Sequence, residues 1–406
     1  MSTPIRPSDT YSPLYFLGSL GAGGLSVTFF MYLFMWVPHP GIPVPTFEHI
    51  WSALTGGSVY QQAAILIAWA GIAFFVFLNL KYLIWNLKSF SAFKQTEAYE
   101  KLRNSNAETT ITAMPLALAM SINGMFVAGL AFVPGLWSIV EYLFPLAMIA
   151  FGLVGILALQ IIGDFLGRVL TKGGVFDVTA NNSFAQLTPA FALSMVAVGF
   201  AAPAAMSHNT VTVGIALVLS TFFAVAATLY MVVAMITAFN SMLHHGTAKE
   251  SGPTLMVIVP IMTILGITFL RQSHGLHTTF EAHTTAGETL ITLSRLLTIQ
   301  VIFLMLGLLV LRRQGYFKDY VFGSKTSPGS YALVCPGVAL SVMLQFWLNK
   351  GLVAAGVVDK FSLSFWIVSA IAVAFQIAMI ALVLRLNKQH FGRASSDKDG
   401  VAVPAE

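Results

Sequence analysis

The run VGIALVLSTFFAVAATLYMVVAMI at residues 213–236 decides the fold class, because it contains no charged residue. A membrane core about 30 Å thick is crossed by a helix of about 20 apolar residues. A membrane β-barrel instead needs strands of about ten residues in which apolar and polar side chains alternate, and this run does not alternate. The run therefore predicts a membrane-spanning α-helix and argues against a barrel.

Further runs of the same kind predict an all-α integral membrane protein with ten transmembrane helices. Of the 406 residues, 57% are hydrophobic and 9% are charged, and the mean hydropathy is +0.80. A soluble domain carries roughly 25% charged residues, so this composition excludes soluble enzymes and nucleic-acid binders. The predicted spans are residues 13–36, 61–86, 109–134, 137–167, 184–206, 209–240, 253–272, 286–311, 330–349 and 361–386.

The positive charges predict which ends of these helices face the cytoplasm. Most of the 21 Lys and Arg residues fall on the side of the two termini, whereas Arg271, Lys350 and Lys360 fall on the other side. Cytoplasmic loops of membrane proteins carry such an excess of positive charge. We therefore expect a multi-pass protein of a bacterial-type inner (plasma) membrane, with cytoplasmic tails at 1–12 and 388–406 and a transmembrane domain at 13–387.

Prolines lie at similar positions in alternate spans. Pro115, Pro189, Pro260 and Pro336 each follow the start of the third, fifth, seventh or ninth span by several residues, and the first span has glycines instead. Proline removes a helical hydrogen bond, and broken membrane helices are tolerated where the freed carbonyls meet protein or water. The pattern predicts five helical hairpins around a central path, with odd-numbered helices inside and even-numbered helices outside. The alternative is the general abundance of proline and glycine in membrane helices.

This arrangement resembles the tellurite-resistance/dicarboxylate transporter family, which includes the plant slow anion channels. The segments TPAFALSMVAVG (188–199) and VIVPIMTILGI (257–267) are similar to its fifth and seventh helices, and the resemblance covers most of residues 13–387. It implies the hairpin fold, a homotrimer and a pore that a phenylalanine on the ninth helix closes.

The residue at that gate position departs from the family pattern. In YALVCPGVAL (331–340) the matching position is Cys335, just before Pro336. The departure leaves the expected fold in place but weakens the expectation of channel-like conduction. The cysteine also resembles that of the TsoY-type transporter-like proteins, some of which carry selenocysteine.

Polar residues on the odd-numbered spans are the candidates for the lining of the path. No carboxylate lies in the middle of an odd-numbered span, so a neutral or anionic solute fits better than a cation. The alternative is that each hydroxyl bonds to the backbone of its own helix. The candidate pore and gate residues are Ser121, Asn123, Thr188, Ser194, Thr263, Thr268, Cys335, Pro336, Ser341, Gln345 and Phe346.

Charged and ionisable residues near the ends of spans predict an outer mouth. Arg271 ends the seventh predicted span, and His274 and His277 follow it. A positive mouth concentrates anions, whereas the alternative is an arginine side chain that snorkels to the interface. Glu288 and Arg295, seven residues apart on the eighth span, are expected to form a structural polar pair. The histidines lack the pattern of a metal site and no nucleotide-binding loop occurs, so we expect no cofactor, no metal and no enzyme activity.

The sequence thus predicts a membrane channel or secondary transporter that moves a small anion or organic acid through a central pore. Its expected partners are a small anionic or neutral solute and membrane lipids, with no nucleic acid. One alternative is a membrane redox or trafficking protein for a sulfur or selenium species that uses Cys335. Another is a non-transporting membrane scaffold, which would show no solute flux with or without the thiol.

Overall fold

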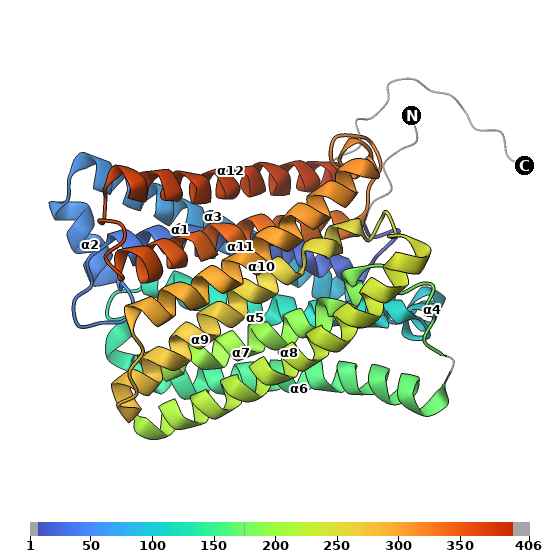
Figure 1. Cartoon of the computed structure of the whole chain (residues 1–406), viewed down its shortest axis with the longest axis horizontal. Coiled ribbons are helices and arrows are strands. Elements are labelled where there is room, and N and C mark those ends of the chain that lie inside the picture. The colour runs from blue at the N-terminus through green and yellow to red at the C-terminus, as the bar shows by residue number, and fades with distance from the viewer. Residues whose placement is uncertain (1–6, 174, 393–406) are drawn as a thin grey trace, which may run out of the picture.

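The computed structural model describes residues 7–173 and 175–392, and every regular element in this part of the chain is helical (Figure 1). Ten helical segments there are long and apolar enough to cross a membrane, which confirms the prediction of an all-α, ten-span membrane protein. The odd-numbered spans are η1 (Pro13–Tyr15) with α1 (Phe16–Trp36), η2 (Asn106–Thr112) with α5 (Ala113–Phe132), η4 (Phe184–Leu187) with α7 (Thr188–Met206), η5 (Gly252–Met256) with α9 (Ile258–Phe280), and η7 (Pro328–Leu333) with α11 (Val334–Phe346) and the π-helical turn η8 (Trp347–Val353).

The even-numbered spans are single long helices. They are α3 (Val59–Phe93), α6 (Val140–Lys172), α8 (Thr210–His245), α10 (Ala286–Arg313) and α12 (Leu363–Phe391). Shorter elements lie in the connections between spans: α2 (Phe47–Gly56), α4 (Glu97–Arg103), the 3-10 turn η3 (Leu136–Ile139) and the π-helical turn η6 (Phe317–Val321).

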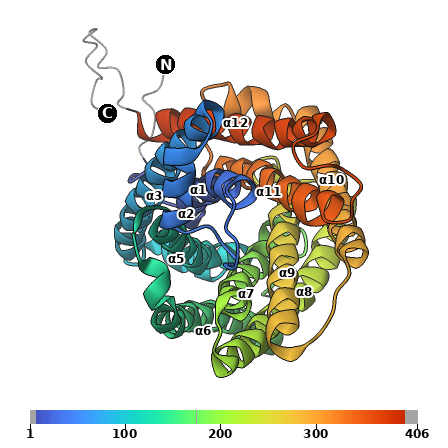
Figure 2. The same ribbon diagram turned by 90° about the vertical axis from the view of Figure 1, so that its left-hand side faces the viewer.

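The odd-numbered spans form a closed inner ring (Figure 2). α1 contacts α5, α5 contacts α7, α7 contacts α9, α9 contacts α11, and α11 contacts α1 again. In the most apolar window of each odd-numbered span, 56% to 89% of the residues are buried, against 17% to 39% for the even-numbered spans. Each odd-numbered span also contacts the span that follows it. The odd helices are therefore inside and the even helices outside, as the sequence predicts.

Glycines on α1 allow close packing against α11. A Cβ atom added at Gly24 would lie 2.8 Å from Cγ1 of Val338, and one added at Gly21 would lie 3.0 Å from Cγ1 of Val334. Such distances are shorter than an ordinary van der Waals contact, and small residues let helix backbones approach closely in membranes. These glycines therefore fix the position of the first span in the inner ring.

Each odd-numbered span begins as a 3-10 helix and continues as an α-helix. The change occurs at a proline in four spans, since Pro115, Pro189, Pro260 and Pro336 are each the second or third residue of their α-helix. The first N–H groups of a helix have no intrahelical acceptor, so proline costs little there. The prolines therefore mark a change of helix type rather than the mid-helix break that the sequence analysis expected. Serine immediately precedes all five 3-10 segments, at positions 12, 105, 183, 251 and 327.

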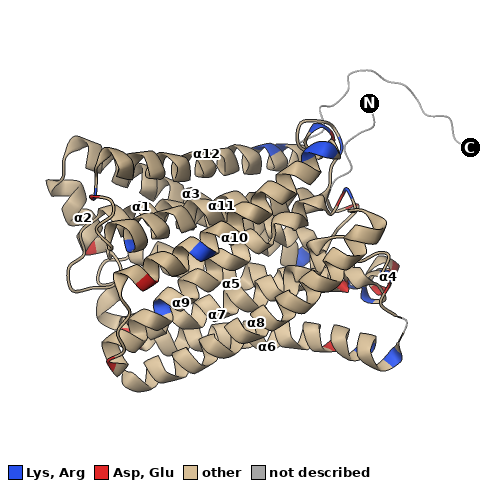
Figure 3. Ribbon diagram, viewed as in Figure 1, with Lys and Arg blue, Asp and Glu red and all other residues tan. Residues whose placement is uncertain are grey.

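The five 3-10 segments, η1, η2, η4, η5 and η7, contact one another in a second closed ring, which we call the collar. Each segment buries an apolar or aromatic side chain: Tyr15, Ile111, Leu187, Leu255 and Tyr331. The collar lies at the same end of the bundle as α4, which we call the α4 end, and the opposite end carries α2 (Figure 1). Lys and Arg residues gather mainly toward the α4 end (Figure 3).

Candidate central cavity

A cavity of about 1020 Å³ lies inside the ring of odd-numbered spans. All five inner helices line it, together with the loop between α1 and α2. Its lining extends from Cys335 and Pro260, next to the collar, to His39 and Val44 at the α2 end. The cavity therefore continues toward the α2 end, and the collar lies between it and the α4 end.

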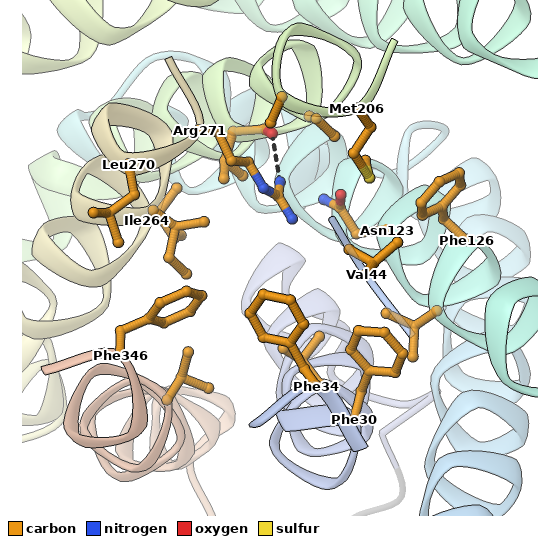
Figure 4. A pocket seen from close by; sticks show the side chains of 18 of the residues that line it. Phe30, Phe34, Val44, Asn123, Phe126, Met206, Ile264, Leu270, Arg271 and Phe346 are labelled. Atoms are coloured by element: carbon orange, nitrogen blue, oxygen red, sulfur yellow. Dashed lines mark hydrogen bonds between the residues drawn. The ribbon is translucent and has the colours of Figure 1, made fainter. Parts of the chain in front are cut away.

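Arg271 is the central polar residue of this cavity (Figure 4). The sequence analysis ended the seventh span at residue 272, but α9 continues to Phe280, so Arg271 lies within the helix and lines the cavity wall. Its Nη1 atom donates a hydrogen bond of 2.9 Å to the backbone carbonyl of Val198 on α7. The side chain is only partly exposed.

No carboxylate compensates this charge within the described residues. The ion pairs found there involve other side chains, and the cavity lining contains neither Asp nor Glu. A cation removed from water is costly unless an anion pairs with it. The guanidinium group has five N–H donors, and Nη1 uses one of them in the hydrogen bond to Val198.

Asn123 on α5 lies on the same side of the cavity as Arg271 (Figure 4). Its Nδ2 atom donates a hydrogen bond of 3.1 Å to the carbonyl of Ala119 on its own helix. The amide is also 3.7 Å from the sulfur of Met195. Arg271 and Asn123 together make one polar side of an otherwise largely apolar chamber.

Aromatic rings form the opposite side. Phe30 and Phe34 of α1 and Phe346 of α11 face Arg271 across the cavity (Figure 4). The rings of Phe34 and Phe346 have centroids 6.1 Å apart, and those of Phe30 and Phe34 are stacked with centroids 6.4 Å apart. Aromatic pairs at this separation pack favourably.

Ionisable groups line the mouth at the α2 end. Lys350 on η8 is exposed, and its Nζ atom lies 5.6 Å from the ring centroid of Phe34. His39, in the loop after α1, stacks on the same ring at 5.7 Å. Burial lowers the pKa of His39 below its ordinary value, which keeps its ring neutral at neutral pH. His274 and His277 on α9 also line the cavity, in the region where the sequence analysis expected an outer mouth.

The structure brings some of the sequence candidates into the cavity and places others elsewhere. Ser121, Ser194 and Thr268 donate to carbonyls of their own helices, and Thr188 donates to the carbonyl of Ala185 in the adjoining η4 turn, as the alternative reading expected. Ser341 and Gln345 are buried outside the cavity lining, and so are Pro115, Pro189 and Pro336. The candidates that line the cavity are Asn123, Pro260, Thr263, Arg271, His274, His277, Cys335 and Phe346.

Thr263 joins the cavity wall to an outer helix. Its hydroxyl donates to the carbonyl of Ala339 at 3.0 Å, and the buried amide of Gln300 on α10 donates to Thr263. The sequence analysis missed Gln300 because it considered uncharged polar residues only on odd-numbered spans. The signal was present as a lone amide within an apolar run.

The expected pair between Glu288 and Arg295 does not form. Glu288 instead accepts hydrogen bonds from the backbone and hydroxyl of Thr285 and so caps the start of α10. Capping satisfies an N–H group that the helix itself leaves free. Arg295 is exposed on the outer face of α10, away from the cavity lining.

No protein-family model matches this chain, and no curated protein matches it. The class of protein is therefore defined by the fold and the cavity alone. It is a multi-pass helical membrane protein whose inner ring encloses a chamber with a single arginine in its wall.

Proposed function

We propose that this protein is a channel or secondary transporter that moves a small anion or organic acid through the central cavity. The observation that carries the proposal is Arg271, a partly buried cation that faces the cavity with no carboxylate beside it among the described residues. The cavity extends to the α2 end, so a soluble anion can reach Arg271 from there. This anion would supply the negative charge that Arg271 lacks. No redox or hydrolytic step is needed for this role.

In an alternating-access cycle, the collar would be the closed gate between the cavity and the α4 end. The cavity approaches the α2 end, whereas the collar's buried side chains separate it from the α4 end. A solute that enters from the α2 end would therefore stop near Cys335 until the five 3-10 segments move apart. We take the α4 end as cytoplasmic, because Lys and Arg gather there.

A flux screen tests this function. The purified chain is reconstituted in proteoliposomes, and the uptake of chloride, nitrate, sulfite, short carboxylates and dicarboxylates is measured against protein-free liposomes. We expect flux of at least one of these anions. Flux of none of them under either sign of membrane potential would contradict the proposal and favour the scaffold alternative.

Cys335 supports a second candidate function, a redox or trafficking role for a sulfur or selenium species. The thiol lines the inner end of the cavity, so a solute that reaches the collar would meet it. Cys335→Ser separates the two roles, because a redox role requires the thiol whereas anion passage does not.

The family resemblance also supports a homotrimer, for which native mass spectrometry should give the mass of three chains.

A further inference from the structure

The distribution of polar groups in the cavity bears on which anion it takes. Arg271 and Asn123 lie on one side, and Phe30, Phe34 and Phe346 lie opposite (Figure 4). Ile264 and Leu270 of α9 add aliphatic surface between these two sides. We propose that the cavity binds a monocarboxylate with an apolar body of several carbons, its carboxylate on Arg271 and its body against the aromatic side. This rests on the proposed function only in that both take Arg271 as the anion site.

The size of the chamber argues against an inorganic anion as the molecule it fits. Pockets of roughly 300–1,000 Å³ suit organic ligands of many atoms, and this cavity has about 1020 Å³. Chloride on Arg271 would leave the partly exposed rings of Phe34 and Phe346 uncovered. An apolar body covers them and removes that surface from water, which is favourable in proportion to the area covered.

The aromatic side opposite Arg271 argues for one carboxylate rather than two. A second carboxylate placed against Phe30 or Phe346 would lose its hydration without a partner. The next cation, Lys350, is exposed at the mouth and lies over the ring of Phe34. A dicarboxylate that bridges Arg271 and Lys350 is therefore the competing outcome, and the experiment includes it.

The guanidinium geometry suits a carboxylate. An arginine presents paired N–H groups that match two carboxylate oxygens. The hydrogen bond from Nη1 to Val198 fixes the orientation of the group and leaves its other donors for a ligand. The Asn123 side chain lies on the same side of the cavity as Arg271 (Figure 4).

The test is isothermal titration calorimetry of the full chain in lipid nanodiscs with acetate, butyrate, hexanoate, succinate and chloride. Burial of each methylene should tighten the Kd about fourfold, so hexanoate should bind about fifteenfold more tightly than butyrate. Butyrate should bind more tightly than succinate or chloride. Empty nanodiscs and the uncharged hexanamide measure partition into lipid.

Variants separate the two sides of the cavity. Arg271→Gln should weaken hexanoate at least about tenfold and leave hexanamide unchanged, and Arg271→Lys, which keeps the charge, should retain part of the binding. Phe34→Ala should reduce the gain per methylene and leave acetate unchanged. Arg295→Gln is the matched control, because Arg295 is exposed on α10 outside the cavity lining. Thermal melting establishes that each variant is folded.

Equal Kd values for acetate and hexanoate, or tighter binding of succinate than of butyrate, would overturn the inference, and so would the absence of carboxylate binding. These outcomes are distinguishable from failure of the proposed function. Tight, chain-length-dependent binding without any flux would retain the binding site and reject transport. Flux of chloride or nitrate, together with carboxylate Kd values that do not change with chain length, would retain transport and reject the monocarboxylate.

Discussion

Two single residues in the cavity wall determine which chemical groups a solute meets. Arg271 offers an uncompensated charge midway along the cavity wall, and Cys335 offers a thiol at the end next to the collar. Sequence reasoning selected both residues but ended the seventh span at residue 272. The polar run after residue 270 lowers the mean hydropathy, although the backbone stays helical to Phe280.

Cys335 should be labelled faster from the α2 end than from the α4 end. The thiol lines the cavity, and the collar separates it from the α4 end. In vesicles of defined orientation, a small membrane-impermeant maleimide should react faster in the right-side-out form. The chain contains one cysteine, so the signal reports on this thiol alone, and Cys335→Ser gives the background. Faster reaction in inside-out vesicles would mean that the collar is not the closed end.

At the scale of helices, hydropathy predicts the spans but not the details of the inner ring. Hydropathy predicts the ten spans well because each must be apolar throughout. It does not predict the 3-10 collar, because the choice between 3-10 and α depends on contacts between spans far apart in the chain. It also does not tell which face of a uniformly apolar helix meets a cavity, and Phe30 and Phe34 on α1 were missed for this reason.

Gly24→Ala should separate α1 from α11. The added methyl group would lie 2.8 Å from Cγ1 of Val338, and such overpacking costs about 1–3 kcal/mol of unfolding free energy. The measurement is thermal unfolding in detergent followed by intrinsic fluorescence. Gly163→Ala on α6 is the matched control, because nothing lies within 4 Å of its added Cβ and alanine favours a helix. An unchanged melting temperature for Gly24→Ala would show that the α1–α11 contact is looser than described.

Glu108→Gln should destabilise the collar. Glu108 on η2 is buried, and its carboxylate pairs with Arg103 at 2.7 Å and with Arg168. Loss of its charge removes the buried anion that both arginines contact, at a cost of about 1–3 kcal/mol. Asp164→Asn is the control, since that carboxylate is 64% exposed and lies 3.6 Å from Arg103, so its removal should cost less than about 1 kcal/mol. Equal melting temperatures of the two variants would contradict the prediction.

Across the whole molecule, the distribution of charge predicts an orientation in the membrane. Lys and Arg gather toward the α4 end (Figure 3), and short positive loops remain in the cytoplasm during insertion. A reporter fused after Glu406 should therefore read as cytoplasmic, and one inserted between α9 and α10, at 281–285, as external. The opposite pair of readings would reverse the orientation and make the cavity open to the cytoplasm.

The most direct test of anion transport through the cavity compares flux in two arginine variants. Arg271 lines the cavity and Arg295 lies exposed on the outer helix α10, so both substitutions remove one positive charge from a membrane span but only one alters the proposed path. Hexanoate uptake into proteoliposomes is measured at equal protein density for Arg271→Gln, Arg295→Gln and the unmodified chain. We predict that Arg271→Gln lowers the initial rate at least about tenfold while Arg295→Gln retains it. Equal rates for a folded Arg271→Gln variant and the unmodified chain would contradict the role of Arg271 in an anion path.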